Sequence, residues 1–199
     1  MIEELFNPHS EKINSQNNGA VSIRRASFNK HIDASKRNLG FAEILESRGG
    51  LPEKNECVLI KSNGCSDTGS IFEYISETGI IDEMYLSTWI ISRTNIDYLA
   101  EKIDAGKIKK LVFIISVRQK QLKKSNYAHL VEELQKRKEI ATFKVCNCHA
   151  KTFSCKVGKN YYTVTGSGNW TKNPRIENYI VMNDKDVFLH NKEWMEDLI

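Results

Sequence analysis

Apolar and polar positions along residues 57–146 follow two alternating patterns, which predict strands and helices in turn. Stretches with apolar residues at helical spacing separate short runs rich in β-branched residues. One run, 111–115, is apolar throughout, as is typical of a strand buried on both faces. The predicted order is strand 58–61, helix 70–78, strand 83–91, helix 95–105, strand 110–117, helix 126–138 and strand 141–146. Such alternation favours βαβ units and a largely parallel sheet.

Two further strand-like segments, 152–156 and 161–165, flank a Gly158-Lys159-Asn160 turn signal. They predict a β-hairpin with a three-residue loop, which adds antiparallel strands. If Val157 faces Tyr161, the same register pairs Lys151 with Ser167 and His149 with Asn169, all on one face. The predicted fold class is α/β, with a mixed β-sheet sandwiched between helices.

Residues 1–56 are more polar and less regular than the rest of the chain. A helix is predicted over 34–48, ended by Gly49-Gly50-Leu51-Pro52. We therefore expect 1–56 to be an N-terminal arm or extension and 57–199 to be the catalytic domain.

Composition narrows the class of protein. The chain has 199 residues, a formal charge of +4 and no apolar run long enough to span a membrane. The first residues show no signal-peptide pattern, so a cytoplasmic protein without membrane contact is expected. The five cysteines are an odd number, which favours free thiols over a disulfide framework.

The segments around the predicted hairpin carry groups that can handle a phosphate. His149 offers an imidazole that can attack or protonate, Lys151 an ammonium, and Ser167 and Asn169 hydrogen-bonding groups. From His149 to Arg175 there is no acidic residue, so an anion is favoured there. The glycines on either side of Ser167 are expected to let a ligand oxygen approach the backbone.

A metal site is the competing interpretation of the same region. Cys146, Cys148, His149 and Cys155 lie close together in sequence, but they lack the Cys-x-x-Cys spacing and the distant second pair of common zinc sites. The prediction is therefore no metal and no cofactor, and stoichiometric zinc in purified protein would reverse it.

The motifs H-A-K at 149–151, G-S-G-N-W-T at 166–171 and I-E-N at 176–178 together resemble the single-copy signature of the phospholipase D superfamily. The resemblance covers roughly 57–190, and its specific part is 149–178. It implies a phospholipase D/nuclease-like fold and metal-independent phosphodiester hydrolysis. By position, His149 is the nucleophile that forms a phosphohistidine, and Lys151 and Asn169 hold the phosphate. Ser167 shapes the phosphate site, and Glu177 supports a histidine.

The chain departs from the family pattern at Lys156, where the family usually has an aspartate, and in a longer run from there to the GSGN segment. A second H-x-K, His190 to Lys192, has no GSxN-like segment after it and is interpreted as a coincidence. A single motif implies a two-fold symmetric homodimer. In that dimer His149 of one subunit attacks and His149 of the partner subunit protonates the leaving oxygen.

The substrate is the least defined part of the prediction. Residues 102–124 hold eight basic side chains against one acid, either as a solvated surface or as a strip that follows a nucleic-acid backbone. Trp89 and Trp170 are core residues or stacking platforms for bases. Short single-motif members of the family suggest a nuclease, with DNA favoured over RNA as the partner. The alternative is a catalytically degenerate nucleic-acid-binding module of the same fold, which Lys156 supports; lipid hydrolysis is not favoured.

Overall fold

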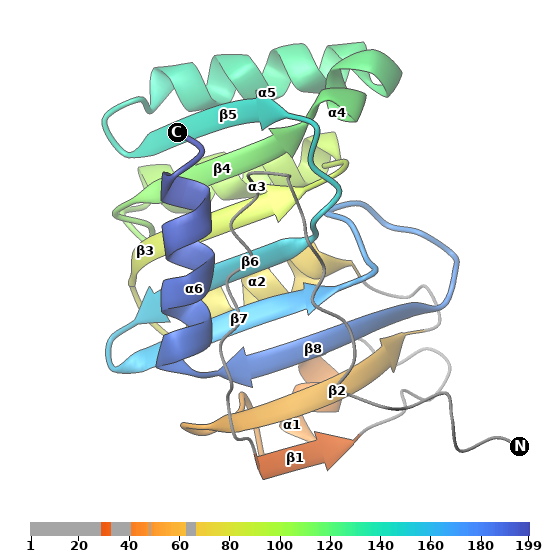
Figure 1. The fold of residues 1–199 in the computed structure, drawn as a ribbon, viewed down its shortest axis with the longest axis vertical. Helices are drawn as coiled ribbons and strands as arrows, with labels where there is room; N and C mark the ends of the chain where they lie inside the picture. Colours follow the sequence, from red (N-terminus) through yellow and green to blue (C-terminus); the bar gives the residue numbers. More distant parts are fainter. Residues whose placement is uncertain (1–28, 33–40, 48, 63–66) are drawn as a thin grey trace, which may run out of the picture.

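A computed structural model describes residues 29–32, 41–47, 49–62 and 67–199 of the chain. Strands and helices alternate through its first part, and strands dominate the part after residue 140 (Figure 1). The strands are β1 Asn29–Ile32, β2 Glu56–Ser62, β3 Ile81–Thr88, β4 Leu111–Ser116, β5 Ala141–Cys146, β6 Thr152–Val157, β7 Asn160–Gly166 and β8 Glu177–Asn183. The helices are α1 Phe41–Glu46, α2 Thr68–Glu77, α3 Arg93–Asp104, α4 Val117–Leu122, α5 Lys124–Lys136 and α6 Lys185–Glu196.

The described strands form one mixed sheet of eight strands in the order β1-β2-β8-β7-β6-β3-β4-β5. β1 and β2 are parallel, as are β3, β4 and β5, while the pairs that involve β6, β7 or β8 are antiparallel. The expected mixed sheet is confirmed, but it is not largely parallel. The C-terminal strands β6, β7 and β8 enter between β2 and β3 and occupy the middle of the sheet.

Helices cover both faces of this sheet, as expected for the predicted fold class. The larger core lies under α1, α2, α3 and α5 and contains Ile71, Phe72, Phe113 and Phe153. On the other face α6 covers a smaller cluster that includes Tyr85 and Phe188 (Figure 1).

Local sequence explains where several elements begin. The side chains of Asp67, Ser92 and Asp184 each accept a hydrogen bond from a backbone N–H in the first turn of α2, α3 and α6, respectively. β4 is buried along its whole length, because alternate residues contribute to the two clusters. The apolar run therefore predicted a doubly covered strand correctly.

The strands and helices predicted between residues 58 and 146 are all present, with ends that differ by a few residues. The short helix α4 was not predicted. Ser116 caps it, and its Gln119 is fully buried and bonds both the N–H and the C=O of Ile91 at 3.1 Å. A polar residue that is buried for such a reason gives no apolar signal in the sequence.

The hairpin of β6 and β7 is present, but its predicted register was wrong by one residue. Val157 pairs with Asn160, so that the turn has two residues, Gly158 and Lys159. Gly158 has a φ of 57° and stands at the position where a type II′ hairpin turn needs glycine. The shift removes the predicted strand pairing of Lys151 with Ser167.

The boundary expected at residue 57 does not describe the core. Phe41, Ile44 and Leu45 of α1 belong to the main cluster, and the Phe41 ring meets Tyr179 of β8 edge-on at 4.7 Å. β1 pairs with β2. The described parts of 1–56 are therefore integrated with the sheet. α1 lies within the helix predicted over 34–48, of which 34–40 and 48 lie outside the described residues. Among the described residues, no helix has both the length and the apolar character that crossing a membrane requires.

Candidate active site

The predicted site residues meet at one edge of the sheet. β5 and β7 end at this edge, and β6 and β8 begin there. The connection from β5 to β6 therefore passes the ends of β4 and β3 toward the segment that follows β7 (Figure 1). His149 and Lys151 belong to this connection. All five predicted residues, His149, Lys151, Ser167, Asn169 and Glu177, line one open pocket of about 720 Å³.

His149 is exposed and lies against Trp89, with ring centroids 5.1 Å apart. The Nζ of Lys151 is 3.0 Å from the backbone oxygen of His149, to which it donates, and 3.4 Å from Nδ1 of its ring. The same ammonium lies 5.8 Å from the centroid of the Trp89 ring. Trp89 therefore supports both reactive groups from one side.

The ionisation of Lys151 is affected by its half-buried position. Burial lowers the pKa of its ammonium, and the Glu177 carboxylate and the Cys148 thiol act in the opposite direction. An incoming phosphate would add negative charge beside this group, so that binding favours the protonated lysine.

Ser167 and Glu177 form a connected group on the other side of the pocket. The Ser167 hydroxyl donates to Oε2 of Glu177 in a short contact and accepts from the backbone N–H of Asn178 at 2.9 Å. The other oxygen of Glu177 accepts from Nδ2 of Asn173 at 2.7 Å. Among the described residues, the hydrogen bonds of the Glu177 carboxylate thus go to Ser167 and Asn173 and not to His149.

The segment Gly166–Thr171 is held in place by the first turns of α2 and α3. Thr68 donates through its hydroxyl to the C=O of Gly168 at 2.9 Å, and Asn95 donates through its amide to the C=O of Trp170 at 2.9 Å. The Trp170 side chain is buried, 1% exposed, against Phe72 and Phe153. Trp170 is therefore a core residue, whereas Trp89 borders the pocket.

The glycines of the GSGN segment have a different role from the expected one. A Cβ at Gly166 would lie 2.0 Å from the backbone oxygen of Asn178, and a Cβ at Gly168 would lie 2.0 Å from the Tyr179 hydroxyl. Both positions require glycine because β8 packs directly against them. The sequence indicated that a ligand approaches these glycines closely, whereas in the structure the closely packed group is strand β8.

A buried polar atom of Asn169 has no partner among the described residues, and the same is true of Nε1 of the neighbouring Trp170. Oδ1 of Asn169 is buried and makes no hydrogen bond within the described chain. The side chain lines the same pocket as His149 and Lys151. An unsatisfied buried polar atom costs free energy, so a donor arriving with substrate would stabilise this site.

Trp89, Asn173 and Arg175 also line the pocket, although the sequence did not place them among the catalytic residues. Trp89 follows β3, whereas Asn173 and Arg175 lie between the GSGN segment and β8. Asn173 bonds Glu177, and Arg175 adds an exposed cation to the pocket. Arg175 was part of the acid-free stretch in the sequence, but nothing there distinguished it from other surface cations.

Lys156, which replaces the aspartate of the family pattern, lies away from the pocket. It is near the far end of β6, and its ammonium is 3.4 Å from Oδ2 of Asp82. His190 and Lys192 of the second H-x-K lie on α6, where Lys192 pairs with Glu83 at 2.6 Å. Neither of these two residues lines the pocket around His149.

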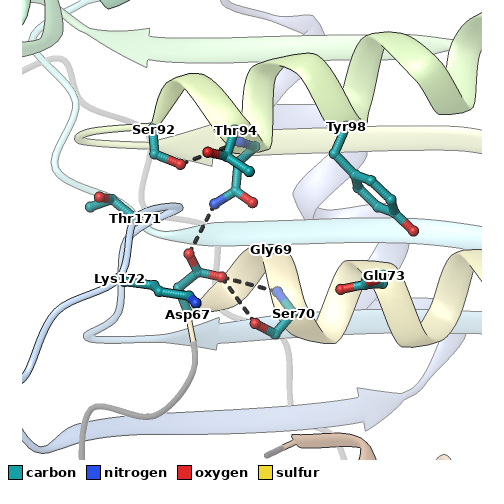
Figure 2. A pocket seen from close by; sticks show the side chains of 10 residues that line it. Asp67, Gly69, Ser70, Glu73, Ser92, Thr94, Tyr98, Thr171 and Lys172 are labelled. Atoms are coloured by element: carbon teal, nitrogen blue, oxygen red, sulfur yellow. Dashed lines mark hydrogen bonds between the residues drawn. The ribbon is translucent and has the colours of Figure 1, made fainter.

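A second pocket, of about 500 Å³, lies where α2 and α3 begin (Figure 2). Asp67 accepts there from the backbone and hydroxyl of Ser70 and from the Asn95 amide. Thr171 and Lys172 close it on the side of the GSGN segment. The segment 169–173 therefore has the candidate active site on one side and a polar pocket on the other.

The eight basic residues of 102–124 do not form one continuous strip. Four of them, Lys102, Lys107, Lys109 and Lys110, lie before β4. Lys102, Lys109 and Lys110 pair with Glu77, Asp82 and Glu196, respectively. The four that follow β4 lie at the same edge of the sheet as His149. They are Arg118, Lys120, Lys123 and Lys124. Of the eight, only this second group lies at the edge of the sheet where the pocket opens.

The described residues contain no group of three or more His, Cys, Asp or Glu side chains arranged as they would be to hold a metal ion.

The sheet order and the helices on both faces define a mixed α/β fold. Two solved structures have a similar fold. Polyphosphate kinase from Porphyromonas gingivalis matches with a TM-score of 0.55 and 13% identity over 79% of this chain. Phosphatidylserine synthase from Haemophilus influenzae Rd KW20 matches with a TM-score of 0.51 and 14% identity over 71% of it.

The chain spans 27% of the polyphosphate kinase and 38% of the phosphatidylserine synthase. No protein-family model and no curated protein sequence matches it. At these identities the likeness establishes the fold, and the chemistry has to be argued from the pocket.

Proposed function

We propose that this protein is a metal-independent phosphodiester hydrolase that acts on nucleic acid through a phosphohistidine intermediate. The observation that carries the proposal is the convergence of His149, Lys151, Ser167 and Asn169 in one open pocket, although they come from two separate connections. An accessible imidazole beside an ammonium and neutral hydrogen-bonding groups can serve nucleophilic attack on a phosphate. The two structural neighbours, a polyphosphate kinase and a phosphatidylserine synthase, agree with phosphoryl-type chemistry on this fold.

In the proposed first step, a ring nitrogen of His149 attacks phosphorus, and the bond from phosphorus to the leaving oxygen breaks. The attacking nitrogen must be unprotonated, so the proton of the neutral ring has to be on the other nitrogen. The contact of 3.4 Å between Lys151 and Nδ1 is long for a hydrogen bond. Lys151 can therefore leave this contact at little cost, and in turning to the phosphate oxygens it would exchange its bond to the His149 carbonyl oxygen for a charge-assisted one.

The leaving oxygen needs a proton, and we propose that it comes from His149 of the partner subunit in a homodimer. The pocket is open, and one chain supplies one H-x-K and GSxN pair to it. A two-fold axis beside this edge of the sheet would bring two copies of the imidazole together. Water then attacks the phosphohistidine, releases the second product and regenerates the free imidazole.

Nucleic acid is the proposed substrate class because the pocket shares its edge of the sheet with several cations. Arg175 borders the pocket, and the basic residues of α4 and of the beginning of α5 lie at the same edge of the sheet. Repeated phosphates would contact several of these cations at once, with an affinity that falls as salt rises. DNA is the first substrate to test, followed by RNA.

The test is incubation of the purified protein with labelled single- and double-stranded DNA and RNA in EDTA, together with His149→Ala. Because His149 is exposed, the variant should keep its fold and lose cleavage completely. Thermal unfolding of both proteins provides the control for folding. Cleavage by the variant at the wild-type rate would disprove the assignment of the nucleophile.

A catalytically degenerate nucleic-acid-binding module of the same fold is the second candidate, and the observation in its favour is Lys156 in place of the family aspartate. Salt-dependent binding by the wild-type protein without product, over long incubation, would establish this second function. The ion pair of Lys156 with Asp82, remote from the pocket, favours the enzyme.

A further inference from the structure

Two thiols stand directly before the proposed nucleophile. Cys146 is the last residue of β5, and Cys148 immediately precedes His149. The backbone N–H of Cys148 donates to the C=O of Cys146 at 2.9 Å, which closes a three-residue turn. Both cysteines are free and partly exposed, and both pack against the cluster under α6.

The turn brings the two cysteines into the range of a disulfide. Two residues of extended chain span about 7 Å at most, and the turn shortens this distance. Disulfides join Cα atoms about 4.4–6.8 Å apart. Burial raises the pKa of the Cys146 thiol, and the neighbouring Cys148 thiol acts in the same direction.

The other described cysteines are placed differently. Cys155 is fully buried in the main core, and burial raises the pKa of its thiol well above the usual range. Cys57 is also buried. Among the cysteines that the structure describes, a soluble oxidant therefore reaches Cys146 and Cys148 most readily.

We propose that Cys146 and Cys148 are a thiol–disulfide modification site that controls the position of His149. The oxidant is a small disulfide of the glutathione class. The Cys148 thiolate attacks one sulfur of this molecule and releases one thiol. The Cys146 thiolate then attacks the mixed disulfide, so that the bond between Cys146 and Cys148 forms and the second small thiol leaves. The pair loses two electrons and two protons, and the small disulfide gains them.

Such a bond would be reversible and would disturb the site. A ring closed over three residues constrains the unfolded chain little and strains the turn, and strained, accessible disulfides are the easily reduced ones. His149 is bonded to Cys148 through one peptide unit, so a changed turn moves its imidazole away from Trp89 and Lys151. A displacement of about 1 Å in a catalytic group can lower the rate by about 10²-fold.

The experiment compares reduced full-length protein with protein treated with oxidised glutathione. Peptide mass mapping should show that the peptide with Cys146 and Cys148 loses two hydrogens, and dithiothreitol should restore them. Nuclear magnetic resonance of the imidazole nitrogens should show a shift of the His149 signal on oxidation, with His149→Ala used to assign it. Cys148→Ser is the matched control, because it keeps the turn but cannot form the bond.

The effect on cleavage depends on the proposed function, whereas the mass and the His149 signal do not. If the reduced protein cleaves nucleic acid, oxidation should lower kcat by about 10²-fold and leave Cys148→Ser unchanged. If the reduced protein cleaves nothing, the proposed function fails. The peptide mass and the His149 signal still test the proposed disulfide in that case. Formation of a mixed disulfide alone, no reaction, or a disulfide with an unmoved His149 signal would each overturn the inference.

Discussion

Lys151 illustrates at the residue scale how the environment of one side chain determines the conditions for function. Its ammonium is half-buried beside His149 and above the Trp89 ring, and it has the Glu177 carboxylate in its vicinity. A sequence motif supplies the lysine, but its neighbours set the pH range in which it carries charge.

Burial lowers the pKa of Lys151, so this lysine loses its proton at a lower pH than an exposed one. The charged form binds an oxyanion, so affinity should be complete below this pKa and should fall as pH rises through it. Calorimetric titration with inorganic phosphate, from neutral to alkaline pH, measures the fall. Lys151→Arg is the matched control, since a guanidinium keeps its charge to above about pH 12. An equal decline in both proteins would contradict the role of Lys151.

Gly168 gives a second prediction at this scale. In Gly168→Ala the new Cβ would meet the Tyr179 side chain at 2.0 Å, and Tyr179 is buried. Overpacking of this kind costs about 1–3 kcal/mol. The melting temperature of a protein of this size falls by roughly 2–4 °C per kcal/mol. Lys172→Ala, an exposed change in the same segment, should leave it unchanged, and an equal melting temperature for both variants would refute the packing argument.

At the element scale, the positions of the helices α2, α3 and α4 determine the shape of the site. α2 and α3 hold the carbonyls of the GSGN segment through Thr68 and Asn95. α4 holds Ile91, which pairs with Trp170 of the same segment in an isolated bridge. The pocket is therefore assembled by contacts between segments that are far apart in the sequence.

Gln119 tests this arrangement. Gln119→Ala removes both partners from the backbone of Ile91 and leaves a buried donor and a buried acceptor unsatisfied. The free energy of unfolding should fall by about 2 kcal/mol or more, as urea denaturation would show. Gln121→Ala, in the same helix but exposed, is the control and should change it by less than about 0.5 kcal/mol. Comparable losses in the two variants would contradict a special role for Gln119.

At the scale of the whole molecule, the open pocket raises the question of what completes the site. His149 is exposed, and the two oxygens of Glu177 accept from Ser167 and Asn173. The proposed answer is a second copy of the chain, which would supply the acid for the leaving oxygen.

Mixing subunits tests this proposal. Wild-type protein and His149→Ala would be unfolded together, refolded at equal concentrations and assayed for cleavage. If each site needs both imidazoles, only wild-type dimers are active, and activity per total dimer should fall to about a quarter. Light scattering establishes the dimer independently. Activity of one half, as independent monomers would give, would be evidence against the shared site.

The sequence by itself determined the alternation of strands and helices, the doubly buried β4 and the hairpin, because local periodicity and turn residues encode them. It also placed the chemically useful residues in two short motifs. The tertiary structure decided the insertion of β6, β7 and β8 between β2 and β3, since pairing between distant strands leaves no local signal.

The same distinction applies to the site. The sequence indicated His149, Lys151, Ser167, Asn169 and Glu177, but the register used to bring them together was wrong by one residue. They share a pocket because both connections leave the sheet at one edge, where α2, α3 and β8 fix the GSGN segment. Only three-dimensional packing could reveal Trp89 beside His149 and the tight contact of Gly168 with Tyr179, because both depend on residues that are distant in the chain.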